Sequence, residues 1–422
     1  MEDLAYSTKF VQRRHSKVTG FTFLIAVLTG LASAAPSLES ICSHLGIRIS
    51  RQAIDQRFNR YSVAFLKACL ELLFQKISSS ITTTPVAGLF SRVLVCDSTQ
   101  WKLKKKLAKA YRGFGGSASK ASCKLQTIIE PLSGKIVHWY YSRACFPDQG
   151  YAKNLPGLLN PLDVLLMDLG YYSVKVFKTI ERKKAFFISR IHYNAAIRTL
   201  SVPSLKTNVA GLLKTFSDPL NDMQLIVGSE QTMELRLIAV KLPSEKAAAQ
   251  RRRVKENYRK QGRQASKEKL QCCDWNVLIT NLKPSLLLSA EQILQLYATR
   301  WQIEIFFRDA KSLLRINVCR SSKKSRFEAE LLGTLFLASL LFFLYGCFNN
   351  RAKKKETESS LDKIIKRFKD LASSFFSLLR LQTQHALQSA VKLLLRLLRN
   401  SIKFHQPTRK TPRELLKSCG VA

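Results

Sequence analysis

The chain has 422 residues, 46% of them hydrophobic, so it can fill the cores of two or three domains and is not a disordered tail. Lysine and arginine outnumber aspartate and glutamate by 69 to 29, which gives a formal net charge of +40. This excess predicts a polyanionic partner, nucleic acid before an anionic membrane surface. The ten cysteines include no C-x-x-C motif and no histidine pairing at zinc spacing, which indicates reduced thiols in a cytoplasm.

Two apolar stretches resemble membrane signals. Basic residues 12–17 followed by apolar residues 21–32 have the order of a signal peptide, and residues 331–348 are nearly continuous apolar sequence that could just span a bilayer. The region before the first stretch is long for a signal peptide, and the second stretch directly follows a helix with a polar stripe, described below. We therefore expect no signal peptide, and we expect residues 331–348 to form a core helix.

Residues 1–85 are expected to be helical, with a helix-turn-helix-like pair at 37–59. Ser50 is placed to cap the second helix of this pair. Helix pairs of this kind are also common in proteins that do not bind DNA. If the pair does bind DNA, five polar side chains of the second helix could face a groove: Arg51, Gln52, Gln56, Arg57 and Asn59.

Two short apolar runs, 92–96 and 164–167, have the composition of buried strands, and each is followed at once by an aspartate, Asp97 or Asp168. Taken singly, each aspartate is typical of a turn at a strand end. If the strands are neighbours in one sheet, however, both carboxylates converge on one spot. Asp163 lies at the opposite end of its strand and would be about 15 Å away.

The segment between these strands is basic and then rich in glycine. Residues 113–120, which end in Lys120, could bring backbone amides close to a phosphate, or could form an ordinary hairpin turn. A β-hairpin is expected at 123–129 and 135–141, because a turn sequence separates two strand-like runs. A helix at 171–184 and a strand at 185–189 would follow Asp168.

Residues 191–273 interrupt this alternation and predict a β-rich insertion. Within them, residues 246–269 contain ten Lys/Arg and only two Glu. Such a run is usually a solvated face, but here Arg251, Arg252 and Arg253 could contact a DNA backbone. Strand-like sequence returns at 275–280.

A helix is predicted from about 290 to 314, because no glycine or proline interrupts it. At about 100° per residue, one polar stripe carries Tyr297, Arg300, Glu304 and Lys311. A carboxylate can hold a metal ion, and the cations and the phenol around it can hold phosphate oxygens. An ordinary Glu-Arg salt bridge on a helix face is the alternative. The adjacent sector should face a core; it carries Leu296, Ile303, Phe306, Phe307 and Leu314.

The spacing Y-x2-R-x3-E-x6-K in that stripe resembles the signature of the insertion-sequence-four family of bacterial DDE transposases. Four further features are similar to that family and occur in the same order. They are the D-S-T that begins at Asp97, the glycine-rich loop, the D-L-G-Y that begins at Asp168, and the long insertion before the glutamate. The resemblance covers roughly residues 10–350. It departs at Leu169, where arginine is frequent in the family.

The resemblance implies an α/β fold with a ribonuclease-H-like core, in which Asp97, Asp168 and Glu304 bind two divalent ions. Oxygen ligands favour Mg²⁺, with Mn²⁺ as an alternative. Arg300, Lys311 and Tyr297 would contact phosphates beside the cleaved end. Trp275 matches a tryptophan that stacks on a flipped base in relatives, although a strand tryptophan is more often part of a core.

The implied organisation has five parts: a helical DNA-binding region at 1–85, the core at 86–190 and 274–350, the β-rich insertion at 191–273, and a helical basic region at 351–422. The implied activity is metal-dependent cut-and-paste transposition in the cytoplasm, with association with the nucleoid. The partners would be terminal repeats, target DNA and a second subunit in the synaptic complex. The alternatives are a related regulator without catalysis and a basic membrane protein.

Overall fold

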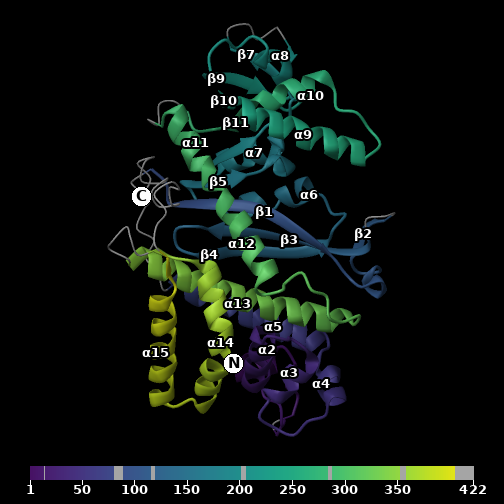
Figure 1. The fold of residues 1–422 in the computed structure, drawn as a ribbon, viewed down its shortest axis with the longest axis vertical. Helices are drawn as coiled ribbons and strands as arrows, with labels where there is room; N and C mark the ends of the chain where they lie inside the picture. The colour runs from purple at the N-terminus through teal and green to yellow at the C-terminus, as the bar shows by residue number, and fades with distance from the viewer. Residues whose placement is uncertain are drawn as a thin grey trace. The chain divides into compact units, whose positions relative to one another are not determined.

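The computed structural model describes residues 1–13, 15–79, 89–115, 119–200, 206–283, 288–351 and 358–403 (Figure 1). The chain divides into two compact units. The helical unit comprises Met1–Thr82, Ser98–Phe146 and Gln302–Lys410, and the sheet unit comprises Thr83–Asp97, Pro147–Trp301 and Thr411–Ala422. Three regions named in the sequence analysis lie outside the described residues. They are the boundary expected near residue 85, the centre of the glycine-rich loop at 116–118, and the part of the basic carboxy-terminal region beyond 403.

Three parallel strands form the centre of the sheet unit. They are β1 (Arg92–Lys102), β5 (Asp163–Met167) and β6 (Phe186–Arg190), with β5 between the other two. The residues of β5 are all buried, as its unbroken apolar sequence predicts. Strand β1 was expected to end at Cys96 but continues to Lys102, so Asp97 lies within a strand and not in a turn.

The sheet continues from β6 through antiparallel strands in the order β11, β10, β9, β7 and β8. Residues 191–273 therefore supply strands that extend the same sheet within this unit. These strands are β7 (Ala196–Thr199), β8 (Thr207–Asn208), β9 (Leu220–Val227) and β10 (Met233–Lys241), and β11 (Trp275–Thr280) follows them in the chain. The helices of the sheet unit are α6 (Asp148–Ala152), α7 (Val174–Arg182), α8 (Val209–Leu213), α9 (Ser244–Lys260), α10 (Lys267–Gln271) and α11 (Ala290–Ala298).

The helical unit begins with five helices, as the sequence predicts. They are α1 (Glu2–Ser7), α2 (Gly20–Ala32), α3 (Leu38–Ser43), α4 (Arg51–Arg57) and α5 (Arg60–Ser79). Ser50 caps α4 by accepting a hydrogen bond from the Ala53 amide, which confirms its expected role. The residues of α2 are buried from Phe23 to Ala32, so the apolar stretch that resembles a signal peptide is part of this unit's core.

The predicted hairpin is confirmed by β3 (Ser119–Glu130) and β4 (Lys135–Arg143), which pair from Glu130 and Lys135 outward; β2 (Arg112–Gly115) pairs with the other edge of β3. Gly134 has a positive φ of 67°, and a side chain there would collide with the Phe342 carbonyl. This glycine therefore lets the hairpin turn lie against helix α13 (Lys324–Arg351).

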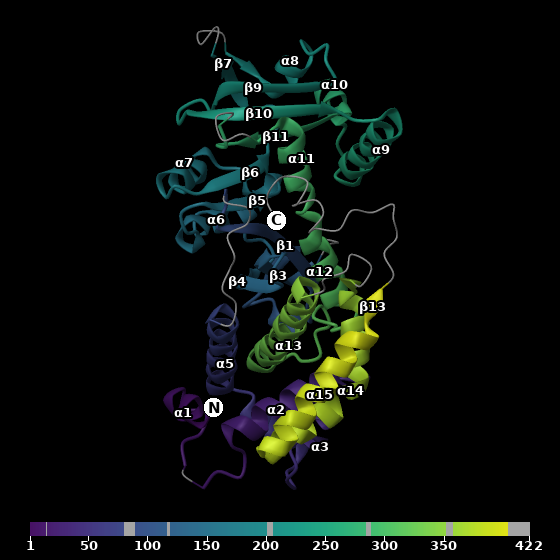
Figure 2. The same ribbon diagram turned by 90° about the vertical axis from the view of Figure 1, so that its left-hand side faces the viewer.

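Helix α13 is long and apolar enough to cross a membrane, the only such helix among the described residues. It packs on α5, α2, β4 and α14 (Leu361–Leu381), and Leu331, Leu335 and Leu341 are buried. These contacts agree with the expected core helix. Figure 2 shows α14 beside α15 (Gln384–Asn400), which packs on it. The short strands β12 (Glu358–Ser359) and β13 (Ile402–Lys403) also pair.

The helix expected at 290–314 is two helices, α11 and α12 (Trp301–Ser312). The Thr299 and Arg300 amides bond to carbonyls three residues back, at 3.1 and 3.0 Å, so the chain tightens between the two helices. The expected single polar stripe is therefore divided, since a uniform rotation of 100° per residue does not hold across this junction. The expected core face of both helices is confirmed, because its five apolar residues are buried.

Candidate active site

A row of charged residues crosses the three parallel strands of the sheet unit. Cys96 is in register with Met167, and Met167 with Ser189, so the next residue of each strand falls on one line across the sheet. That line carries Asp97, Asp168 and Arg190. Because neighbouring strands lie about 4.8 Å apart, the two aspartates are close neighbours. The predicted convergence of Asp97 and Asp168 is thus observed.

Each aspartate of this row has an arginine partner in the same unit. Arg300 Nη1 lies 3.2 Å from Asp97 Oδ2, and Arg190 Nη1 lies 3.7 Å from Asp168 Oδ1. The side chain of Asp97 is only 21% exposed, so this ion pair is partly shielded from water. The two arginines offset the mutual repulsion of the carboxylates.

Asp168 Oδ1 is buried and accepts no hydrogen bond, because Arg190 is too far away to donate one. A buried carboxylate oxygen that lacks a hydrogen bond is costly unless a cation satisfies it. The neighbouring aspartates thus offer the hard oxygen ligands that Mg²⁺ or Mn²⁺ prefers. No group of three or more potential metal ligands is found among the described residues.

Asp163 belongs to a structural ion pair at the other end of β5. Its carboxylate is fully buried and accepts two hydrogen bonds from Arg92, at 3.0 and 2.5 Å. The Asn160 amide donates a third at 2.7 Å. The carboxylate of Asp163 is therefore engaged in structural hydrogen bonds, in agreement with its exclusion from the candidate site.

Tyr297 points into the sheet unit and not toward solvent, where it was expected to meet a phosphate. Its side chain is 6% exposed, and its hydroxyl donates to the Met167 carbonyl at 3.1 Å. Burial raises the pKa of Tyr297 to about 12, so the phenol stays a donor at neutral pH. The hydroxyl thus bonds to the residue before Asp168, and the phosphate contact of Tyr297 stays a prediction.

Glu304 and Lys311 lie on α12 in the helical unit. Glu304 is half-buried in the first turn, where the amino-terminal end of a helix favours a negative charge. Lys311 Nζ donates to the Gln100 carbonyl at 3.4 Å, on strand β1 and three residues beyond Asp97. Burial lowers the pKa of Lys311. Lys311 is thus held against β1.

Asp309 lies on a different side of α12. It is 2% exposed, and it accepts a hydrogen bond from Arg308 at 2.8 Å. Burial raises its pKa, and the charges of Asp362 and Lys366 on α14 act on it. Asp309 therefore faces the carboxy-terminal helices, whereas Lys311 faces β1, and the choice of Glu304 over Asp309 agrees with this geometry.

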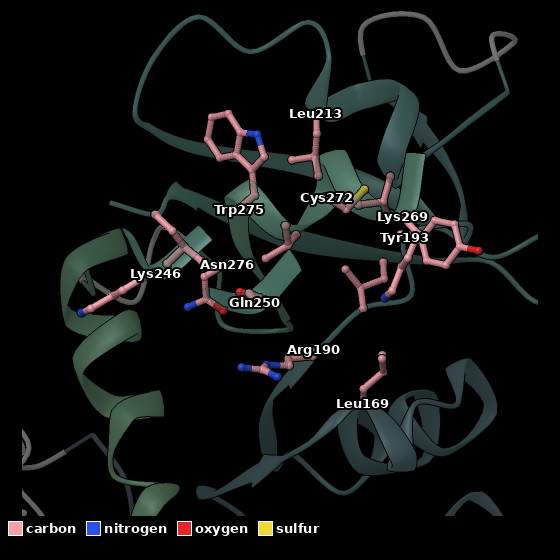
Figure 3. A pocket seen from close by; sticks show the side chains of 14 residues that line it. Leu169, Arg190, Tyr193, Leu213, Lys246, Gln250, Lys269, Cys272, Trp275 and Asn276 are labelled. Atoms are coloured by element: carbon pink, nitrogen blue, oxygen red, sulfur yellow. The ribbon is translucent and has the colours of Figure 1, made fainter. Parts of the chain in front are cut away.

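A cavity of about 360 Å³ adjoins the charged row in the sheet unit; Figure 3 shows Arg190 and Leu169 at one side of it and Trp275 at another. Lys246 from α9 and Lys269 from α10 add positive charge, so part of the basic run 246–269 lines this Trp275 cavity. Trp275 is 9% exposed and contacts Phe216 edge to face, with ring centroids 5.7 Å apart. The Trp275 side chain therefore packs in the core and also lines the cavity.

The remaining predicted DNA contacts differ in exposure. Arg251 pairs with Asp274, which leaves Arg252 and Arg253 as the exposed arginines of that triplet. Arg57 is half-buried and donates to Ser16 at 3.3 Å. Their contact with DNA stays a prediction, as it does for the other exposed candidates Arg51, Gln52, Gln56 and Lys120 and for half-buried Asn59.

Sequence reasoning missed two residues of this site. Arg190 directly follows the buried residues of β6, as Asp97 follows the buried residues of β1, so a similar pattern could have identified it. Asp148 opens α6, and its carboxylate lies 3.3 Å from where a side chain on Gly170 would begin. Its charge also acts on buried Cys96. No pattern around Asp148 indicates this proximity, because the contact depends on how α6 packs.

Known proteins are similar to this chain over most of its length. The family described as "Transposase DDE domain" matches residues 88–341. The transposase for insertion sequence element IS231F of Bacillus thuringiensis subsp. israelensis is 27% identical over 437 residues, covering 97% of this chain and 91% of that protein. The transposase for IS1151 of Clostridium perfringens is 27% identical over 366 residues, covering 81% and 77%.

Among solved structures, the chain is similar to a piggyBac transposase in a synaptic complex with hairpin DNA. The TM-score is 0.46 at 10% identity, with 97% of this chain and 82% of that chain covered.

Proposed function

Because the chain belongs to the DDE transposases, in the insertion-sequence-four family, we propose that Asp97, Asp168 and Glu304 are the catalytic carboxylates with which it moves an insertion sequence. The protein is a DNA transposase, an enzyme that cleaves DNA and transfers strands. Its side chains would carry out this chemistry in the following roles.

The observation that carries the assignment is the pair Asp97 and Asp168, in register on adjacent parallel strands, with one buried oxygen of Asp168 lacking a hydrogen bond. Asp97 and Asp168 would hold Mg²⁺ together with Glu304, the acidic member of the Y-R-E-K spacing. Held there, such ions would supply activation of the attacking oxygen and stabilisation of the leaving oxygen.

Three side chains would act on the DNA backbone beside these carboxylates. Arg300 would exchange its contact with Asp97 for a scissile-strand phosphate as DNA enters, since arginine binds phosphate oxygens in a fork. Lys311 would neutralise a second phosphate. Tyr297 would act through the Met167 carbonyl by holding the end of β5 in place. Arg190 would supply the cation that Leu169 cannot, where relatives often carry arginine.

The Trp275 cavity is suited to a nucleotide displaced from the helix. Trp275 and Tyr193 offer aromatic surface, and Arg190, Lys246 and Lys269 offer positive charge for its phosphates. Lys269 Nζ lies 4.8 Å from the centre of the Tyr193 ring, so charge and aromatic surface are adjacent there. The cavity supports the role of Trp275 that the family resemblance implies.

The protein would work in the cytoplasm on nucleoid DNA, with its own terminal repeats and a target site as substrates. Pairing of two ends makes a homodimer the natural assembly.

The test is end cleavage of the DNA that flanks the protein's own gene, with Mg²⁺, with Mn²⁺ and with chelator. Wild-type protein should cleave only with a metal ion, and Glu304→Ala should lose cleavage by more than a hundredfold while keeping its affinity for the end. Asp309→Asn is the matched control on the same helix and should retain activity. End binding by wild type without cleavage under any metal condition would favour the non-catalytic regulator and contradict the assignment.

A further inference from the structure

A second cavity, of about 470 Å³, lies in the helical unit and has no part in the site described above. We call it the amino-terminal cavity. It is lined by the loop between α1 and α2, by Ile49 before α4, and by residues 57–61 at the end of α4 and the start of α5. Its volume is within the range of ligand-binding clefts, about 300–1,000 Å³.

The lining of this cavity is strongly cationic. It includes Lys9, Arg13, Lys17 and Arg57, together with His15, and the described residues that line it include no aspartate or glutamate. Four like charges around one opening repel each other, and an anion in the opening relieves that repulsion. The basic segment 12–17 thus contributes to a binding surface.

The walls of the cavity are held by specific contacts. Ser16 accepts a hydrogen bond from Arg57 at 3.3 Å and donates to the Val18 carbonyl at 2.8 Å, which fixes the guanidinium against the loop. The Glu2 carboxylate accepts hydrogen bonds from the Gly20 and Phe21 amides, at 3.1 and 3.0 Å, and so closes the loop at its base. The positive charges are therefore carried on a built loop and not on a free tail.

The nearest acidic residue of α4 does not neutralise this surface. Asp55 is engaged elsewhere, with Lys323 at 3.5 Å and Arg326 at 3.4 Å. Tyr61 lines the cavity, and its hydroxyl accepts a hydrogen bond from Arg60 at 2.7 Å, so a further cation contacts a lining residue. The field of the cavity thus stays positive at its mouth.

We propose that the amino-terminal cavity binds backbone phosphates of the end DNA, with Arg13, Lys17 and Arg57 as the contacting cations. This inference rests on the proposed function, because it takes the ligand to be the DNA that the catalytic residues cut. A strand of phosphates fits this cleft because four of the residues that line it are cations and none of its described lining residues is an acid. Arg57, expected to face a groove, would then position the duplex instead of reading its sequence.

The experiment measures the affinity of the full chain for a duplex of its own end at several salt concentrations. Arg13→Gln combined with Lys17→Gln is compared with Lys175→Gln combined with Lys183→Gln, a pair of equally exposed lysines at α7 in the sheet unit. Log affinity falls as log salt rises, and each lost phosphate contact should make this negative slope shallower by about 0.9. The first variant should therefore lose about 2 from the slope, equally for native and scrambled duplexes, and the second should lose nothing.

Three outcomes would overturn the inference: a wild-type slope in the Arg13/Lys17 variant, an equal loss in the Lys175/Lys183 variant, or a loss confined to binding of phosphatidylglycerol vesicles. The last result would identify a membrane surface as the partner. Failure of the proposed function is separate, because it would appear as absence of metal-dependent cleavage in wild-type protein. Arg13 and Lys17 are exposed, so matching thermal unfolding curves should verify that the fold is retained.

Discussion

Asp97 and Asp168 stand side by side on parallel strands, where two negative charges repel each other unless cations lie nearby. Arg300 and Arg190 supply that charge from the junction of α11 and α12 and from the end of β6. The arginines leave one oxygen of Asp168 without a hydrogen bond. The pair is therefore held in place while this one oxygen of Asp168 lacks a hydrogen bond, which suits a group that must bind a metal ion.

Tyr297→Phe should slow end cleavage about fivefold without preventing DNA binding. The variant loses the hydrogen bond to the Met167 carbonyl, which contributes about 1 kcal/mol. Since burial raises the pKa of Tyr297 to about 12, the phenol is a donor throughout, and the ratio of wild-type to variant rates should stay constant between about pH 6 and pH 9. Tyr6→Phe, at an exposed site on α1, is the control; a ratio that changes steeply with pH would contradict this role.

Arg300→Ala and Lys311→Ala should impair the step after the first nick more than they impair end binding. A charge-assisted hydrogen bond contributes about 1.5–3 kcal/mol, so the loss should be about 10- to 150-fold in the rate of hairpin formation. Gel assays that resolve nicked, hairpin and cleaved ends separate the two effects. Arg308→Gln removes an exposed cation from the same helix and should have little effect. Equal losses in binding and hairpin formation would refute the assigned roles.

The aspartates could be predicted from sequence because a charge directly after an unbroken apolar run is unusual, and parallel strands bring such positions together. Arg190 is less conspicuous in the sequence, because the polar residue Ser189 separates it from the apolar run of β6. The orientation of Tyr297 could not be predicted in this way. It depends on the tightened backbone at Thr299 and Arg300, where no glycine or proline marks the change.

At the scale of elements, the sequence predicted several strands, among them β3, β5 and β11, but not which strands pair with each other. The strands of residues 191–273 continue the sheet because β10 pairs with β11 and β11 pairs with β6, and these pairings bring together segments far apart in the chain. Local periodicity carries no information on such partners. Some helices carry a local signal, since Ser37, Ser50 and Ser289 cap α3, α4 and α11, whereas α8, α9 and α10 lie in the segment predicted to be β-rich.

A buried ionic network holds the amino end of α13 in the helical unit. Glu330 accepts a hydrogen bond from Arg326 at 2.9 Å and lies 3.9 Å from Arg320, while Arg326 also reaches Asp55 at 3.4 Å on α4. Burial raises the pKa of Glu330, against the opposing effect of the arginines. The network therefore links α13 to the helix pair expected to bind DNA.

Glu330→Ala should destabilise the helical unit by about 3–5 kcal/mol, because it leaves buried arginine charge without its partner. Thermal or urea unfolding of the full chain measures the change. Lys324→Ala on the same helix removes a lysine that is 60% exposed and lies 3.7 Å from Glu328, and it should cost less than about 1 kcal/mol. Similar unfolding curves for the two variants would show that the buried network contributes no more than a surface pair.

For the whole molecule, the dominant fact is a net charge of +40 on a chain of 422 residues. Such a charge speeds association with DNA and disfavours contact between two free copies of the chain. Both effects weaken as salt rises, and two DNA ends would neutralise much of the charge that keeps copies apart. Assembly of two subunits should therefore depend on DNA.

We expect the protein to be monomeric in the absence of DNA and to form a complex of two chains with two ends when end DNA is added. Light scattering coupled to size exclusion measures both masses at the same salt concentration. Scrambled duplex of equal length is the control, because it neutralises charge to the same degree without offering an end sequence. A stable dimer in the absence of DNA would show that apolar contacts outweigh the repulsion. A cleaving complex of one chain with one end would remove the need for pairing altogether.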